Sequence, residues 1–194
     1  MRRLALCCLT LLALAGCSTT PPVTGTAARA AALAPSLTWR AVGKMDYEQR
    51  TPGLGQSYRY QSEAGWADVY VYSANRTDWA EGTADAAFDA HFRQVRQEVE
   101  YMASQGAYQN LLLRGTQDEV VGVQTFRHTW MNFSARGRDV ESHIYLTARQ
   151  GRLLKYRLSF ALPTPPGLEA ELHRFIADRM RELLPVAAHL PDGI

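Results

Sequence analysis

The residues best placed for binding chemistry are four tyrosines and an aspartate around one tight turn. The set consists of Tyr58, Tyr60, Asp68, Tyr70 and Tyr72. If the turn pairs Ser62 with Trp66, all five side chains lie on one face of a hairpin, because alternate residues of a strand point to the same side. Aromatic rings combine apolar area with a hydroxyl, so with a carboxylate they could hold a sugar or a peptide. The same spacing is also typical of cross-strand aromatic pairs that only stabilise a sheet.

The five histidines form no recognisable metal motif. They are His91, His128, His143, His173 and His189. No two of them stand at the i, i+4 spacing of helical metal ligands, and no carboxylate accompanies a pair. We interpret His128 as a hydrogen-bonded core histidine and His143 as part of a polar, solvated face. No metal ligand and no cofactor are predicted.

Catalytic motifs are also absent from the sequence. There is no G-x-S-x-G elbow, H-E-x-x-H helix, P-loop, glycine-rich dinucleotide turn or EF-hand spacing. Asp139, Ser142 and His143 are neighbours, but strand alternation turns Ser142 and His143 to opposite faces. No catalytic residue is predicted, although a triad assembled from distant residues stays open.

The amino-terminal residues predict an exported precursor. Arg2 and Arg3 precede an apolar run from Leu4 to Leu14, which has the length of a signal peptide and is too short to span a membrane. The run ends in Leu-Ala-Gly-Cys17, which resembles the bacterial lipobox. That resemblance implies cleavage before Cys17, a diacylglycerol on its thiol and an acyl chain such as palmitate on its amino group. Ser18 rather than Asp follows, which by analogy with enterobacterial sorting implies the outer membrane, facing the periplasm.

Charge and cysteine content agree with an envelope protein. The precursor carries a formal charge of +2, and loss of residues 1–16 removes two arginines and leaves it neutral. A neutral chain lacks the basic footprint of a nucleic-acid binder, so none is expected as a partner. The mature chain keeps Cys17 alone, so no disulfide can form within it.

Composition divides the chain into four parts. Residues 1–16 form the signal peptide, and residues 17–36 form the lipidated cysteine with a flexible tether that lacks aromatic residues. Residues 37–188 suffice for a single domain with a sizeable core. Residues 189–194 form a tail.

Two amphipathic helices and several hairpins are predicted within the domain. The helical stripes are Phe88, Phe92, Val95, Val99 and Met102, and Leu168, Leu172, Phe175, Ile176 and Leu183. Gly65, Gly137 and Gly151 each stand fourth in a turn, which suits three-residue hairpin loops. Those loops pair Ser134 with Arg138 and Ala148 with Arg152.

This register predicts one apolar face and one polar face on the sheet. The apolar face collects Phe126, His128, Trp130, Val140, Ile144, Leu146, Leu154, Tyr156, Leu158 and Phe160. The polar face collects Arg127, Thr129, Glu141, His143, Tyr145, Lys155, Arg157 and Ser159. A slip of one residue would exchange the two sets on a strand.

These elements predict an α+β fold, a single antiparallel sheet of about six to seven strands with two long helices, in the order strands-helix-strands-helix. With its hairpin near residues 58–72 and its closing helix, the order over residues 39–185 resembles the PsbP-like fold. Segments such as 68–72 and 154–158 also look like those of small proteobacterial lipoproteins. Neither resemblance implies a site residue.

Three functions follow as hypotheses. The first is a non-enzymatic accessory protein of the envelope that binds a protein or glycan through its sheet face or hairpin. The second is an envelope hydrolase, which needs a polar cleft with a perturbed acid or base. The third is a carrier of a lipid or small hydrophobic ligand, which needs an apolar cavity.

Overall fold

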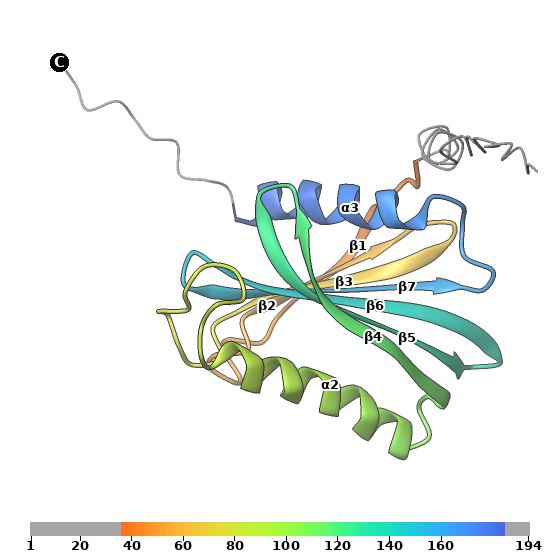
Figure 1. The fold of residues 1–194 in the computed structure, drawn as a ribbon, viewed down its shortest axis with the longest axis horizontal. Helices are drawn as coiled ribbons and strands as arrows, with labels where there is room; N and C mark the ends of the chain where they lie inside the picture. Colours follow the sequence, from red (N-terminus) through yellow and green to blue (C-terminus); the bar gives the residue numbers. More distant parts are fainter. Residues whose placement is uncertain (1–35, 185–194) are drawn as a thin grey trace, which may run out of the picture.

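Seven antiparallel strands form one sheet with a helix on each side (Figure 1) in the computed structural model, which describes residues 36–184. The strands are β1 (Arg40–Asp46), β2 (Gln56–Gln61), β3 (Gly65–Tyr72), β4 (Gln109–Val121), β5 (Gln124–Ala135), β6 (Arg138–Arg149) and β7 (Arg152–Ala161). The helices are α2 (Phe88–Ser104), between β3 and β4, and α3 (Leu168–Leu183), after β7. The predicted strand number and element order are therefore confirmed.

Several predictions concern residues outside the described part. The signal peptide of residues 1–16, the lipidated Cys17 and nearly all of the tether lie there, as does the tail of residues 189–194. Within residues 36–184, no helix is long and apolar enough to cross a membrane.

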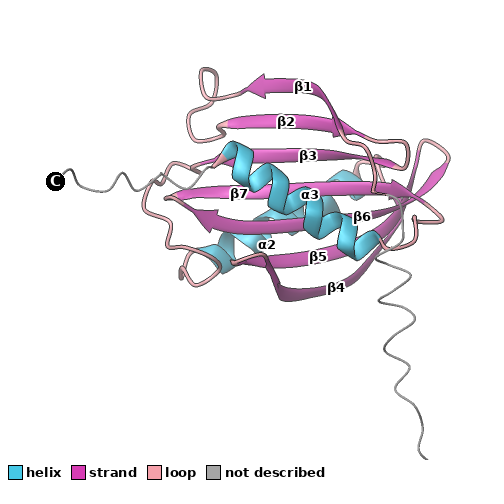
Figure 2. Cartoon of the chain, turned by 90° about the horizontal axis from the view of Figure 1, so that it is seen from above, coloured by secondary structure: helices cyan, strands magenta, loops and turns pink. Residues whose placement is uncertain are grey.

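The strand order places the last strand in the middle of the sheet. It runs β1-β2-β3-β7-β6-β5-β4, so β7 joins the first three strands to the β4–β6 meander. Figure 2 shows α3 lying across the central strands, with α2 beneath them. The strands at the two edges are β1 and β4.

Both faces of the sheet are apolar, because each faces a helix. One core contains Tyr60, Val69, Phe126, Tyr156, Leu158 and Phe160 with the α3 residues Leu172, Phe175 and Ile176. The other contains Tyr72, Met131, Phe133, Val140, Ile144 and Leu146 with the α2 residues Phe88, Phe92, Val95 and Val99. The prediction of one apolar and one polar face is wrong, and the supposed polar face is the floor of the α2 core.

The helical stripes are largely as predicted. Phe88, Phe92, Val95 and Val99 are buried on α2, whereas Met102 at its end is 40% exposed. On α3, Leu172, Phe175 and Ile176 are buried, and Leu168 and Leu183 pack at the margin of the core.

The hairpin register differs from the prediction because the turns hold two residues. Arg136 and Gly137 both have positive φ, and so do Gln150 and Gly151. Two successive left-handed residues make a type I′ turn, whose twist matches that of the flanking strands. Ala135 therefore pairs with Arg138, and Arg149 with Arg152. Arginine and glutamine are unusual at the first turn position, so the sequence pattern did not reveal this turn type.

Each of the two turns displaces the predicted register by one residue. The two displacements cancel between β5 and β7, but they turn the side chains of β6, the strand between them, to the opposite faces of the sheet. Val140, Ile144 and Leu146 face α2, whereas Glu141, His143 and Tyr145 share a face with His128 and Trp130 toward α3. The strand thereby brings two histidines and a glutamate to the same side of the sheet.

The first hairpin is also shifted by one residue. Gln61, not Ser62, pairs with Trp66, and a Ser62 N–H bond to the carbonyl of Gly65 closes the loop. A Cβ on Gly65 would lie 2.2 Å from the carbonyl oxygen of Ser159. Glycine is required there for close approach to β7 rather than for a left-handed turn.

Candidate functional site

The five residues of the predicted aromatic surface are divided between the two faces of the sheet. Tyr58 pairs with Val69 and Tyr60 with Ala67 on the α3 side, whereas Asp68, Tyr70 and Tyr72 alternate on the α2 side. Tyr60 is 2% exposed with its ring centroid 5.4 Å from that of Phe175. The expectation of one shared face is therefore wrong, because the hairpin register is displaced by one residue.

Tyr72 belongs to the α2 core and reaches a histidine. It is 8% exposed, and its hydroxyl lies 2.7 Å from Nε2 of His91. Burial, and then the charge of Lys155, lower the pKa of His91 to about 4. This contact is enclosed by the helix and offers no open surface.

Asp68 and Tyr70 do line an open groove, which we call the arginine groove. It has a volume of about 1110 Å³ and lies between the first hairpin, the segment after α2 and the turn between β5 and β6. Its arginines are Arg59, Arg136, Arg138 and Arg157. Its aromatic walls are Trp66, Tyr70, Tyr108 and Phe133.

Only one of these arginines is neutralised within the described residues. Arg59 holds Asp68 with two bonds, 2.7 Å from Nε to Oδ1 and 3.0 Å from Nη2 to Oδ2. Arg136, Arg138 and Arg157 have no acidic partner there. The guanidinium of Arg157 instead lies over the ring of Tyr108, 5.1 Å from its centroid. The groove therefore presents net positive charge between aromatic walls.

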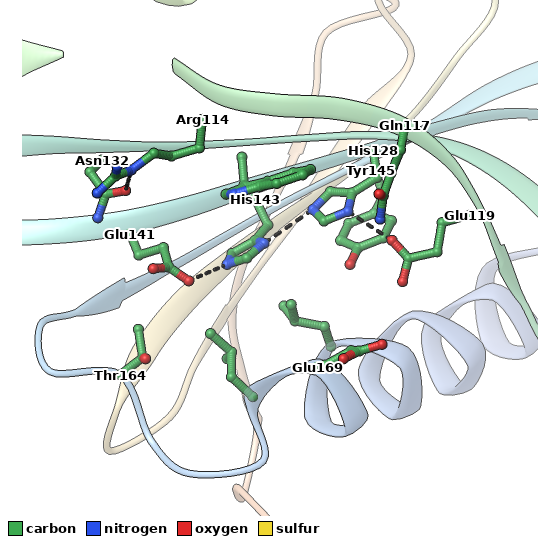
Figure 3. A pocket seen from close by; sticks show the side chains of 13 residues that line it. Arg114, Gln117, Glu119, His128, Asn132, Glu141, His143, Tyr145, Thr164 and Glu169 are labelled. Carbon is green, nitrogen blue, oxygen red and sulfur yellow. Dashed lines mark hydrogen bonds and ion pairs between the residues drawn. The ribbon is translucent and has the colours of Figure 1, made fainter. Parts of the chain in front are cut away.

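The other face carries a second groove, the histidine groove, under the first turns of α3. It has a volume of about 730 Å³ and is lined by β4, β5, β6 and the segment from Thr164 to Leu172. Its polar residues are Arg114, Gln117, Glu119, His128, Asn132, Glu141, His143, Tyr145, Thr164 and Glu169 (Figure 3).

A continuous chain of side chains runs along its floor (Figure 3). Glu141 Oε1 lies 3.0 Å from His143 Nε2, and His143 Nδ1 lies 3.1 Å from His128 Nε2. His128 Nδ1 lies 2.7 Å from Glu119 Oε2, and the other oxygen of Glu119 contacts His173 of α3. Three strands and one helix therefore contribute to a single polar network.

Packing fixes the two central imidazoles. Each has a side chain only 8% exposed. The ring of His128 stacks on that of Tyr145 with centroids 3.9 Å apart and planes 7° apart. Trp130 also packs against His128, with ring centroids 5.1 Å apart, and its indole lies so close to Gly115 that a Cβ there would come within 2.5 Å of the ring.

Burial dominates the electrostatics of this network. Burial, and then the charge of His143, lower the pKa of His128 to about 4. The pKa of His143 is also lowered, first by burial. Burial alone would raise the pKa of Glu119, but contacts with His173 and His128 outweigh it and the pKa is lowered. At neutral pH His128 and His143 are therefore neutral, and Glu119 is ionised.

The sequence contained one signal for this network. The contact between His128 and His143 depends on the type I′ turn at Arg136 and Gly137, which the sequence pattern did not reveal. Glu169 and His173 stand at the i, i+4 spacing that joins side chains along one helix face. A search for paired histidines alone does not find that second pair.

No family model and no curated protein matches the chain. Among solved structures, it is similar to PsbP of the cyanobacterium Synechocystis (CyanoP), with 15% identity, a TM-score of 0.43, and 74% of this chain and 90% of that chain covered. It is also similar to PA94 of Pseudomonas aeruginosa, a protein of unknown function, with 16% identity, a TM-score of 0.37, and coverages of 78% and 83%. Both similarities are distant.

Proposed function

We propose that this chain is a bacterial lipoprotein whose domain binds an acidic segment of another envelope protein in the arginine groove, without catalysing a reaction. The lipobox ending in Cys17 supports attachment to the periplasmic side of the outer membrane. The order strands-helix-strands-helix supports a PsbP-like fold for the domain.

The observation that carries the binding role is the uncompensated charge of Arg136, Arg138 and Arg157 beside aromatic walls. Arginine can hold a carboxylate with two parallel bonds and also stack on an aromatic ring. Arginine, tyrosine and tryptophan are the residues most enriched where protein interfaces derive their affinity. An acidic polypeptide segment matches both the charge and the rings.

Exposed apolar side chains at the margin favour a protein over a small anion. Val42 is 49% exposed, Trp66 37% and Met102 40%, and all three line the groove. β1 also leaves one edge of the sheet unpaired within residues 36–184. Exposed apolar groups next to a free strand edge are typical of surfaces that a partner covers.

Crosslinking in intact cells tests this proposal. A photoreactive residue in place of Trp66 should give one discrete protein adduct, and Arg138→Glu with Arg157→Glu should abolish it by reversing the charge of the groove. The same photoreactive residue in place of Val120, which is 62% exposed on the far edge strand, is the matched control. An adduct that survives the charge reversal, or a glycan adduct in its place, contradicts a protein partner bound by these arginines.

The anchor is tested separately. Cys17→Ser should abolish lipid labelling and leave uncleaved or soluble protein, because Cys17 is the only cysteine after the cleavage site. Membrane-bound, labelled Cys17→Ser protein would contradict the lipobox assignment. Fractionation of the wild type into the inner membrane would contradict only the outer-membrane location.

A hydrolase is the second candidate. The hydrogen-bonded series of side chains Glu141, His143, His128 and Glu119 favours it. The chain supplies buried imidazoles with lowered pKa in a polar groove, which is the arrangement expected of a proton-transfer site. Screening of ester, amide and glycoside substrates should then give an activity that His128→Gln removes. Neither described cavity has the wholly apolar lining that the carrier hypothesis requires.

A further inference from the structure

The histidine groove contains a set of metal-ligand atoms that come from two elements. One ligand atom each from Glu119, Glu169 and His173 lies within 4.8 Å of the others. Glu119 belongs to β4, and the other two stand one turn apart on α3, so both of their side chains reach the same side of the helix. Carboxylate and imidazole groups together suit Zn²⁺ and similar divalent transition-metal ions.

A hydrogen-bond chain behind these residues holds Glu119 in place. Its three links join Glu141 to His143 at 3.0 Å, His143 to His128 at 3.1 Å, and His128 Nδ1 to Glu119 Oε2 at 2.7 Å. The other oxygen of Glu119, Oε1, faces His173. Metal-ligating carboxylates are commonly held by hydrogen bonds of this kind.

We propose that Glu119, Glu169 and His173 bind one divalent transition-metal ion of the Zn²⁺ type. His128, with His143 and Glu141 behind it, then forms an outer shell that orients Glu119, as imidazoles and carboxylates commonly do behind metal ligands. This proposal is independent of the arginine groove and of any hydrolase activity.

Zinc titration of the full-length lipidated chain in detergent tests the site. After treatment with a chelator, calorimetry with ZnCl₂ should give one site per chain. Glu169→Gln and His173→Gln should weaken binding by at least the ~10–100-fold typical of losing an outer-shell residue, because they remove ligands. Glu182→Gln is the matched control, since Glu182 is another exposed glutamate of α3 that pairs only with Arg179 in the described part of the chain.

Two readouts keep the test decisive. Glu169 is exposed, so Glu169→Gln should keep the wild-type circular dichroism spectrum while it loses zinc. Co²⁺ in place of Zn²⁺ should give a visible spectrum of nitrogen and oxygen ligation that His173→Gln removes. Equal zinc affinity of the wild type and Glu169→Gln, no saturable binding by the wild type, or a thiolate charge-transfer band with Co²⁺ would each overturn the proposal.

Discussion

The two faces of this sheet differ in how they treat charge. On the α3 face, the side chain of Glu119 is 14% exposed and contacts the buried His128 and the partly exposed His173. On the α2 face, Asp68 is fully occupied by Arg59, and three other arginines are left without an acidic partner in the described residues. We therefore propose that the α3 face binds a cation and the α2 face an acidic group. A single antiparallel sheet can carry two such unlike sites when each helix leaves part of its face uncovered.

The largest effects should come from the two cores, which we expect to be equivalent. Phe160 on the α3 face and Phe88 on the α2 face are both 0% exposed. Truncation of either to alanine should lower the free energy of unfolding by about 3–5 kcal/mol. Urea unfolding measures this. A loss below 1 kcal/mol for Phe88→Ala would show that the α2 face is not a core and would break the comparison.

Polar substitutions in the two grooves should differ in their effect on the free energy of unfolding. His143→Ala removes the middle of a buried chain and leaves polar groups without partners, so it should cost about 1–3 kcal/mol. Arg138→Ala changes an exposed side chain of the arginine groove and should stay within roughly 0.5 kcal/mol. The same urea experiment compares them. Equal costs would mean that the histidine chain is solvated like the arginines.

Acid should destabilise both faces through their histidines. Burial lowers the pKa of His91 on the α2 face and of His128 on the α3 face, each to about 4, below the value of about 6.5 expected when unfolded. In this pH range the unfolded chain therefore binds more protons than the folded chain. The free energy of unfolding falls as the pH drops from about 6.5 to about 4. Below that window the lowered pKa of Glu119 continues the loss on the α3 face.

Chemical denaturation at several pH values checks this sign. His91→Gln should remove part of the pH dependence of the free energy of unfolding. His128→Gln should remove a separate part of it. A free energy of unfolding that rises on acidification from pH 6.5 would contradict the neutral, buried state of both residues.

The smallest effects should distinguish tyrosines that the sequence pattern groups together. Tyr72→Phe loses a buried bond to His91 and should cost about 0.5–1.5 kcal/mol. Tyr58→Phe loses a bond to Gln56 at a half-buried position and should stay below about 0.5 kcal/mol. Thermal unfolding of the two variants gives the comparison. A larger cost for Tyr58→Phe would mean that the first hairpin has a different register.

Much of the fold was predictable because long periodic patterns depend on burial alone. The stripes from Phe88 to Val99 and from Leu172 to Ile176 predict both helices, and the element order follows. The register was not predictable, since it depends on whether Arg136 and Gln150 adopt positive φ. Neither residue type favours that conformation, so the sequence pointed to the longer turn.

The candidate sites were missed because the predicted register of each hairpin was displaced by one residue. The predicted register of β5 and β6 separates His143 from His128, and that of the first hairpin unites Tyr58 and Tyr60 with Tyr70 and Tyr72, the reverse of the observed faces. A second obstacle is distance along the chain: Glu119 and His173 meet only because α3 folds back over β4. No local spacing encodes such a contact.

Chemical-shift mapping of the full-length chain tests the contrast between the faces most directly. Zn²⁺ and a hexaglutamate peptide are titrated in turn into one isotope-labelled sample. We expect Zn²⁺ to shift the amides around Glu119, His128 and His173, and the peptide to shift those around Trp66, Arg138 and Arg157, with no residue common to both sets. Overlapping sets, or a peptide response confined to the α3 face, would contradict two sites of opposite charge preference.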